Sequence, residues 1–393
     1  MLTKSVGPET WEAESQALPP DPIKVLQLLV SLPVGGAEDL VAATLTGLDP
    51  ERFRVQAACI GPLGAVGEEL AARGHAVVSL GLNIKRTSTL RVAAAVRHLL
   101  KEMRPDILHT HLYHANFYGR LASLGLGLKG VVAAVHNTYT QPKLHRRLAN
   151  FLLARVTDWV LVGSPQVWAD VRRYDWVPAP RLLLLPYGIR LEEPASALSP
   201  EEAKARLGVS GFCVGAVGRL EEQKGHDYLL AAVSELRRQV DGLTVLLVGE
   251  GRQEEALRQQ ARDLGVADVV HFLGTRRDLP LIYRALDVYV QPSRWEGLSL
   301  AMLQAMGAAL PVVVSRVGGA LEVVQDRVNG RLVPVGDPQA LATAVLELYR
   351  QPDQRRRLGE RARRSVSKDY SQEAMLRKLA SLYLELWARG RGR

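Results

Sequence analysis

Two short polar segments carry residue types that could bind and cleave a phosphate ester. Segment 215–225 follows an apolar stretch and contains Arg219 and Lys224, and segment 292–299 contains Glu296 just before an apolar run. Fixed cations stabilise the negative charge that grows on a diphosphate leaving group, and backbone N–H groups at a helix start bind anions. We therefore interpret the pair as a diphosphate site. A charged turn that simply faces solvent is the alternative for the two cations.

The apolar run after Glu296 predicts a helix that begins near Gly297 or Leu298. Gln304 lies eight residues after Glu296, about two helical turns later and nearly on the same face. The two side chains could therefore contact two parts of one ligand. Alternatively, Glu296 only complements the positive end of the helix dipole.

Gly35 and Gly36 follow the first apolar strand and open a helix. Glycines allow close approach of backbone to ligand, and the helix start favours a phosphate. A plain tight turn fits the same residues.

Four histidines lie near the ends of two further strands. His109, His111 and His114 are grouped in the sequence, and His136 precedes Asn137. Further metal ligands at telling spacing are missing, and the sequence has no D-x-D motif. We therefore expect these residues to line a polar cleft or to be satisfied in turns, rather than to form a metal centre. A capping histidine is the alternative for His136.

Apolar strands alternate with helix-like segments along the chain, which predicts parallel, doubly wound α/β domains. A Pro-, Ser- and Glu-rich stretch at 190–200 interrupts the alternation and resembles a linker. We predict a leader at 1–22, Rossmann-like domains at 23–190 and 191–370, and a final helix within 371–393. The predicted strands are Ile23–Val30, Arg54–Ile60, Ala76–Leu80, Asp106–His109, Val131–His136, Trp159–Gly163, Leu182–Pro186, Phe212–Val217, Thr244–Val248, Val269–Phe272, Val288–Gln291, Val312–Ser315 and Arg331–Val335.

Composition fits a globular protein with two cores. The chain has 393 residues, of which 47% are hydrophobic and 23% charged. No apolar run reaches the roughly 18 residues that span a bilayer. The Pro- and Glu-rich leader lacks the apolar core of a signal peptide, so we expect disorder there. Cys59 and Cys213 lie far apart in strand-like segments, which favours buried, reduced thiols and a cytoplasmic location.

The basic charge is concentrated in the first half. Residues 23–190 carry 20 Lys and Arg against 11 Asp and Glu, a surplus of nine. No nucleic-acid-binding motif accompanies this charge, so we expect no nucleic-acid partner. The basic helix predicted at 144–155 could lie on an anionic membrane. A surface helix with its apolar side on the sheet is the interpretation that we favour.

Together these segments resemble the retaining glycosyltransferases of family 4, which have the GT-B fold of two Rossmann-like domains facing each other across a cleft. The resemblance covers nearly the whole chain after the leader. Its motifs are Gly-Gly-Ala-Glu at 35–38, Gly-Arg to Lys-Gly at 218–225, Gly-Glu-Gly at 249–251, Ser-Arg-Trp-Glu-Gly-Leu at 293–298, His-Thr-His at 109–111 and Val-His-Asn at 135–137.

The resemblance implies an enzyme that moves a sugar from a nucleoside diphosphate, UDP- or GDP-linked, to a glycan or lipid-linked acceptor without metal or cofactor. It places the donor in the second half and the acceptor in the first, with a last helix, Gln372–Ala388, that crosses back to the first domain. The implied catalytic residues are Glu296, His136, Arg219 and Lys224. The implied donor-binding residues are Gly35, Gly36, Gly218, Arg219, Lys224, Gly249, Glu296, Gly297, Leu298, Ser299 and Gln304. The implied acceptor-binding residues are His109, His111, His114 and Asn137.

One position departs from the family pattern of Glu, seven residues, then Glu, because the second Glu is Gln304 here. An amide oxygen can still accept hydrogen bonds from ribose hydroxyls, at neutral strength. A nucleotide-sugar epimerase on the same fold and a non-catalytic nucleotide-sugar-binding subunit are the alternatives. The basic first half fits an acceptor held at a membrane, as in surface polysaccharide assembly.

Overall fold

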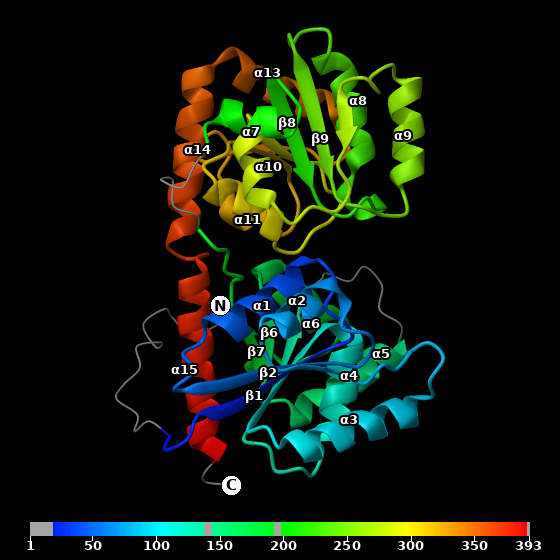
Figure 1. The fold of residues 1–393 in the computed structure, drawn as a ribbon, viewed down its shortest axis with the longest axis vertical. Helices are drawn as coiled ribbons and strands as arrows, with labels where there is room; N and C mark the ends of the chain where they lie inside the picture. Colours follow the sequence, from blue (N-terminus) through cyan, green and yellow to red (C-terminus); the bar gives the residue numbers. More distant parts are fainter. Residues whose placement is uncertain (1–18, 137–143, 192–197, 391–393) are drawn as a thin grey trace. The chain divides into compact units, whose positions relative to one another are not determined.

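A computed structural model describes residues 19–136, 144–191 and 198–390, which form two α/β units (Figure 1). Unit 1 combines the chain up to Pro186 with the segment from Glu373 onward, and unit 2 is Tyr187–Gln372. The boundaries predicted from the sequence, 190/191 and 370/371, lie within four residues of these. The last helix, red in Figure 1, thus belongs to unit 1.

Unit 1 is built on a seven-stranded sheet in the order β3-β2-β1-β4-β5-β6-β7, with every pairing parallel. Its strands are β1 (Ile23–Leu29), β2 (Phe53–Cys59), β3 (Val77–Ser79), β4 (Ile107–His111), β5 (Gly130–Val135), β6 (Trp159–Val162) and β7 (Leu182–Leu184). Its helices are α1 (Gly36–Gly47), α2 (Gly64–Ala72), α3 (Thr89–Met103), α4 (Leu112–Ser123), α5 (Leu144–Leu153), α6 (Pro165–Tyr174) and α15 (Gln372–Gly390).

Unit 2 has a six-stranded parallel sheet in the order β10-β9-β8-β11-β12-β13. Its strands are β8 (Phe212–Val217), β9 (Leu243–Val248), β10 (Val270–Phe272), β11 (Val288–Gln291), β12 (Val312–Ser315) and β13 (Arg331–Val333). Its helices are α7 (Pro200–Arg206), α8 (His226–Leu236), α9 (Glu254–Asp263), α10 (Leu279–Ala285), α11 (Leu300–Gly307), α12 (Ala320–Val323), α13 (Pro338–Arg350) and α14 (Pro352–Ser367).

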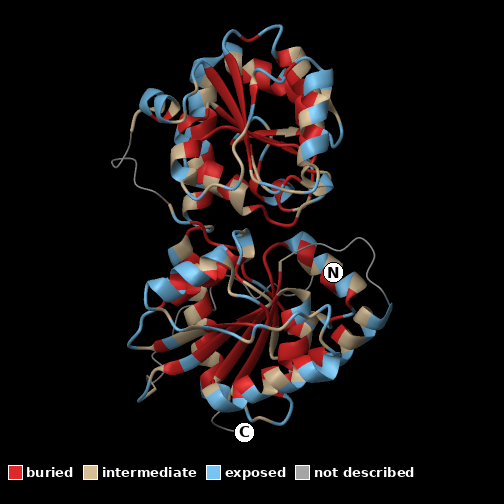
Figure 2. Cartoon of the chain, turned by 45° about the vertical axis from the view of Figure 1, so that its right-hand side comes forward, coloured by how far each residue is buried: buried red, intermediate tan, exposed pale blue. Residues whose placement is uncertain are grey.

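The strands form the buried centre of each unit, and the helices expose one side to solvent (Figure 2). β5 and β9 are buried along their whole length, as expected for parallel strands covered on both faces. Several helices begin at residues with a local reason to start there. Ser199 and Glu202 form a capping box at α7, and the Asp337 side chain caps α13 ahead of Pro338.

Among the described helices, none combines the length and apolar character that crossing a bilayer requires. Both cysteines are buried, free thiols, as predicted. Burial raises the pKa of Cys59 to about 12 and that of Cys213 to about 11, so both thiols stay protonated at neutral pH.

Each sheet reverses its strand order once, between β1 and β4 in unit 1 and between β8 and β11 in unit 2. Open parallel sheets bind ligands outside the carboxyl ends of the strands at such reversals. The segments singled out from the sequence follow β8, β9 and β11 in unit 2, and β1, β4 and β5 in unit 1. The topology therefore gathers the candidate residues at one edge of each sheet.

Candidate functional site

Glycines allow three loops of unit 2 to approach one another, backbone to backbone. Gly249 has φ +130°, and a Cβ there would lie 2.1 Å from the carbonyl oxygen of Gly218. Gly225 has φ +63°, and its Cβ would lie 2.2 Å from the carbonyl oxygen of Pro292. A larger residue at either position would collide with backbone. The loops after β8, β9 and β11 are thereby brought together.

This approach joins Lys224 to Glu296. The ammonium of Lys224 forms an ion pair and hydrogen bond with Oε2 of Glu296, and Nε2 of Gln223 donates to the other carboxylate oxygen at 3.2 Å. The two paired side chains are only 15% and 11% exposed. A cation and a carboxylate 72 residues apart in sequence therefore share one small polar site.

Arg294 also links the loop after β11 to the segment after β8. Its guanidinium makes two parallel hydrogen bonds to the Asp227 carboxylate, at 2.8 and 2.7 Å, and lies 4.2 Å from the ring centroid of Tyr228. It also donates to the carbonyl oxygen of Glu222 at 2.9 Å. Bidentate pairs of this kind fix geometry as well as adding energy. Arg294, Asp227 and Gln223 were missed from the sequence, although Arg294 stands inside the recognised motif.

The two cations lie in different parts of the segment after β8. Arg219 is exposed in the loop. Lys224 ends a 3₁₀ turn, Glu222–Lys224, and α8 begins at His226. The left-handed conformation of Gly225 separates the turn from the helix.

The predicted start of the helix after Glu296 is wrong by two to three residues. α11 begins at Leu300, because the Ser299 hydroxyl caps it by accepting a hydrogen bond from the Met302 amide at 3.3 Å. Glu296 thus precedes the helix, and the same-face argument that linked it to Gln304 does not apply. Leu298 and Ser299, both predicted to bind the donor, are only 6% and 5% exposed.

Gln304 is half-buried in the second turn of α11. Its Oε1 accepts a hydrogen bond from the Tyr283 hydroxyl at 3.1 Å. That hydroxyl comes from α10, a helix that the sequence gave no reason to connect with the site. The amide oxygen is therefore held in place by a neighbouring helix.

The backbone at 296–297 rests on a two-glycine turn after β12. The amide of Gly319 donates to the carbonyl oxygen of Gly297 at 2.8 Å. Gly318 has φ +40°, and a Cβ there would lie 1.7 Å from the carbonyl oxygen of Glu296. The turn therefore leaves no room for a side chain at Gly318, and its backbone contacts support the loop that carries Glu296.

In unit 1, Gly35 and Gly36 lie at the start of α1, as predicted. Gly35 is the N-cap, and a Cβ there would lie 2.5 Å from Oε2 of Glu38, which is 8% exposed. The sequence Gly-Gly-Ala-Glu therefore lets a buried carboxylate fold against its own helix start.

His109, His111 and His136 come together at the reversal point of the unit 1 sheet. Nδ1 of His111 and Nε2 of His136 are 3.1 Å apart, and the two rings stack with centroids 5.3 Å apart. Nε2 of His111 lies 2.6 Å from Oε1 of Gln27, and Nδ1 of His109 lies 2.7 Å from the hydroxyl of Tyr383 on α15. Gln27 and Tyr383 were not identified from the sequence.

Burial keeps these three imidazoles neutral. It lowers the pKa of His109 to about 3 and that of His136 to about 4, and the pKa of His111 also falls well below its usual value. His109 and His111 are each only 4% exposed, and this burial does not favour the predicted direct contact with an acceptor. His136, which is partly exposed, remains the candidate for contact with substrate.

Of the other two predicted acceptor residues, His114 does not join this cluster. His114 is exposed on α4, edge-on to Tyr113 with ring centroids 5.2 Å apart. Asn137 lies outside the described residues. Within the described ranges, no three His, Cys, Asp or Glu side chains are grouped as metal ligands.

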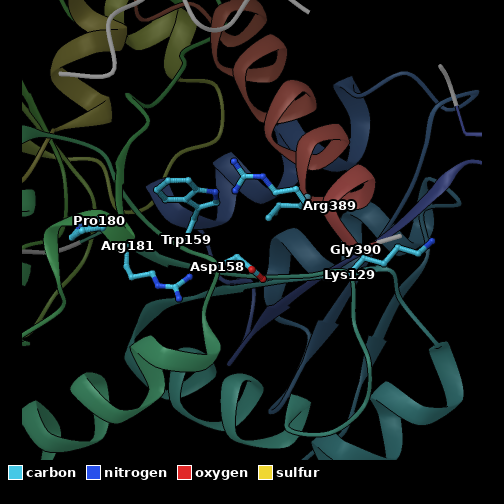
Figure 3. Close-up of a pocket in the computed structure, with 8 residues that line it drawn as sticks. Lys129, Asp158, Trp159, Pro180, Arg181, Arg389 and Gly390 are labelled. Carbon is cyan, nitrogen blue, oxygen red and sulfur yellow. The ribbon is translucent and has the colours of Figure 1, made fainter. Parts of the chain in front are cut away.

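A cavity of about 310 Å³ in unit 1 lies at the other edge of the sheet (Figure 3). Its lining includes Lys129, which precedes β5, Trp159, which begins β6, and Arg389 near the end of α15. Lys129 pairs with Asp106 at 2.7 Å, and Arg389 pairs with a neighbouring glutamate. The cavity is therefore at the amino ends of the strands, away from the residues that could do chemistry.

Comparison with known proteins assigns a family to this arrangement. Residues 34–193 match the family model described as Glycosyltransferase Family 4, and residues 211–351 match the one described as Glycosyl transferases group 1. The two matches cover the carboxyl-edge loops of both sheets.

Two curated relatives are similar over most of their length. The D-inositol 3-phosphate glycosyltransferase of Corynebacterium urealyticum is 30% identical over 308 residues, 72% of each chain. The UDP-Gal:alpha-D-GlcNAc-diphosphoundecaprenol alpha-1,3-galactosyltransferase of Escherichia coli is 25% identical over 340 residues, 83% of this chain and 88% of that protein.

Solved structures share the fold. Anabaena Alr3699/HepE, crystallised with UDP and glucose, superposes with a TM-score of 0.80 at 23% identity, covering 92% of this chain and 99% of that one. WaaG, a glycosyltransferase involved in lipopolysaccharide biosynthesis, gives a TM-score of 0.73 at 18% identity, covering 91% and 99%. The chain therefore belongs to the glycosyltransferases and has the two-domain GT-B fold.

Proposed function

We propose that the protein is a retaining, metal-independent glycosyltransferase that takes a sugar from a UDP- or GDP-linked donor. The observation that carries this proposal is the Lys224–Glu296 pair at the strand-order reversal of unit 2. A mostly buried cation beside a mostly buried carboxylate offers both groups that a sugar diphosphate needs. The cation neutralises phosphate, and the carboxylate accepts hydrogen bonds from sugar hydroxyls.

Donor binding separates the pair in this proposal. Lys224 turns to the diphosphate, joined by the exposed Arg219, and Glu296 exchanges its ammonium partner for sugar hydroxyls. Gln304 receives the ribose hydroxyls through its amide oxygen. The glycine turns at Gly218 and Gly249 let the phosphates approach backbone N–H groups.

The reaction proceeds by substitution on one face of the sugar. The bond between the anomeric carbon and the phosphate oxygen breaks while the acceptor oxygen bonds to the same face. The departing phosphate oxygen takes the proton of the acceptor hydroxyl. Lys224 and Arg219 stabilise the charge that collects on the diphosphate, which makes them catalytic through the transition state. His136 is the proposed unit 1 residue in contact with substrate, and the mechanism needs no side-chain nucleophile.

The proposed acceptor is a glycan or lipid-linked glycan in surface polysaccharide or glycolipid assembly, and helix α5 supports a membrane location. Three of its four leucines face outward and only Leu153 is buried, so the favoured interpretation of a helix with its apolar side on the sheet holds for one end of the helix only. Leu144, Leu148 and Leu152 are 68%, 50% and 51% exposed at four-residue intervals. His145, Arg146, Arg147 and Arg155 accompany them, with no acidic residue in 144–156. An apolar stripe with basic flanks fits the cytoplasmic face of an anionic bilayer.

The donor assignment is tested by thermal unfolding with UDP-, GDP- and ADP-sugars, followed by product analysis with the best donor. A ligand at 100 times its Kd stabilises by about 2.7 kcal/mol, so the correct nucleotide stands out. NMR of the product should show an intact new glycosidic bond with the anomeric configuration of the donor. An isomerised nucleotide sugar would identify an epimerase, and binding without any donor consumption would identify a non-catalytic subunit.

The membrane assignment is tested by co-sedimentation with anionic and neutral vesicles at low and high salt. We expect salt-sensitive binding to anionic vesicles that Leu148→Glu weakens about tenfold, because it removes apolar contact and adds a repelled charge. Leu90→Glu is the matched control, since Leu90 is 83% exposed on α3 of the same unit. Equal binding to both vesicle types, or equal loss in both variants, would leave α5 without this role.

A further inference from the structure

The buried polar groups around His136 form one continuous chain of hydrogen bonds. The chain runs from His136 through His111 and Gln27 to Tyr383 and ends at His109, with each link between 2.6 and 3.1 Å. Gln27 and Tyr383 are fully buried, so water does not compete for the hydrogen bond between them. Its members come from β1, β4, the end of β5, and α15.

The sense of every link follows from the amide of Gln27. Its Nε2 donates to the Tyr383 hydroxyl at 2.9 Å, so the oxygen of that hydroxyl accepts, and Nδ1 of His109, 2.7 Å away, is the acceptor within reach of its proton. This sense puts the hydrogen of His109 on Nε2, a buried atom with no hydrogen-bond partner among the described residues. The amide Oε1 can only accept, so Nε2 of His111 must carry the proton at that 2.6 Å contact.

The remaining link places a proton on His136. A neutral imidazole has one protonated nitrogen, so Nδ1 of His111 carries none and accepts. At the 3.1 Å contact the donor is then Nε2 of His136. Its other nitrogen, Nδ1, is consequently the acceptor nitrogen of the ring. Burial of the cluster, which keeps the rings neutral, agrees with this count.

We propose that Gln27 and Tyr383 are positioning residues that fix His136 as its Nε2–H tautomer, so that Nδ1 accepts a hydrogen bond from a substrate hydroxyl. The hydrogen bond from substrate to Nδ1 rests on the proposed function, whereas the tautomer of His136 does not. The opposite sense of the chain would need a turned-over Gln27 amide and would put the proton on Nδ1 of all three rings. The three histidines thus share one state, and Tyr383 on the last helix sets it together with Gln27.

Tautomers are read directly from ¹⁵N spectra of histidine-labelled protein, with His109→Gln, His111→Gln and His136→Gln used for assignment. In the wild type at neutral pH, we expect all three rings to be Nε2-protonated. A Nδ1–H tautomer at His136 would overturn the proposal, and so would rings in unlike states. This measurement needs no donor, acceptor or activity.

Tyr383→Phe tests the coupling, because it keeps the ring and removes the hydroxyl that orients the amide. We expect His136 to show both tautomers and kcat to fall about tenfold, with KM for the donor within about twofold of the wild type. Tyr118→Phe is the control, since Tyr118 is another buried tyrosine of unit 1, 6% exposed, outside this chain. An unchanged His136 tautomer in Tyr383→Phe would overturn the coupling. A shifted tautomer in a protein without transferase activity would uphold the coupling and count against the proposed function instead.

Discussion

Replacing Lys224 by Met removes the ammonium from the proposed leaving-group site and keeps most of the aliphatic stem. If Lys224 stabilises the departing diphosphate, kcat/KM should fall about 10²-fold or more, as for the loss of one preorganised charge contact. The stability cost is separate. Breaking a buried pair costs about 3–5 kcal/mol when it leaves a charge uncompensated. Here the side chains of Lys224 and Glu296 keep 15% and 11% exposure, and Gln223 still donates to the carboxylate. We therefore expect Lys224→Met to lower the free energy of unfolding by about 2 kcal/mol.

Unit 2 offers a matched control pair. The ammonium of Lys204 lies 2.7 Å from Oδ2 of Asp287, with side chains 14% and 20% exposed, before the first strand of the same sheet. Lys204→Met should therefore destabilise by a similar amount while leaving kcat/KM within about threefold of the wild type. For unit 2, 2 kcal/mol corresponds to a fall in Tm of about 4–8 °C.

A double variant separates charge from packing. Adding Glu296→Gln to Lys224→Met removes the uncompensated carboxylate and should restore about 1 kcal/mol of stability. Activity should not recover, since both proposed ligand contacts are then gone. Steady-state kinetics and calorimetry on the single and double variants and on Lys204→Met make the test. Wild-type turnover in Lys224→Met, or an equal loss in Lys204→Met, would refute a role for Lys224 at the leaving group.

Three further outcomes are expected. Gln304→Leu should weaken donor binding by about 1–3 kcal/mol in calorimetric titration, Gln304→Glu should preserve or strengthen it, and Tyr283→Phe, which removes only the hydroxyl that holds the amide, should cost less. Undiminished binding by Gln304→Leu would remove that residue from the site. Transfer should persist in excess EDTA, and complete loss reversed by Mn²⁺ or Zn²⁺ would show that the histidine cluster had been misinterpreted. Folding lowers the pKa of His109, His136 and His226 to about 3, 4 and 4, so the unfolded chain binds more protons below pH 6.5. Tm should therefore fall as pH drops from 7 towards 4. A Tm that does not change with pH would contradict the lowered pKa values of these buried histidines.

Strand positions could be predicted well because parallel strands covered on both faces are continuous apolar runs. Phe212–Val217, Val288–Gln291 and Val312–Ser315 agree with the structure residue for residue. The errors are of one or two residues at strand ends, and the one in β4 falls at a polar end. β4 extends two residues beyond the predicted end, to His111, because its histidines are satisfied by buried partners rather than by solvent. Polarity alone cannot distinguish these two situations.

The site was predictable only in part, for a similar reason. Lys224 and Glu296 each stand beside a recognisable glycine turn, but their pairing depends on the neighbouring positions of β8 and β11 in the sheet. Gln27 had one available signal, a polar residue inside an otherwise apolar strand. The outward face of α5 could not be foreseen, because periodicity gives the angular width of an apolar stripe and not the direction in which it points.

Because α15 belongs to unit 1, this unit cannot finish folding until the end of the chain has been synthesised. Gln27 and its partner Tyr383 are 356 residues apart, and synthesis at 5–20 residues per second separates them by roughly 20–70 s. During that interval Gln27 and His109 lack the Tyr383 hydroxyl, which is their hydrogen-bond partner in the folded protein. Unit 2 can complete its own fold first. Folding of the first-made domain is therefore complete only after the last helix has been synthesised, and premature termination near residue 380 would leave Gln27 and His109 without Tyr383.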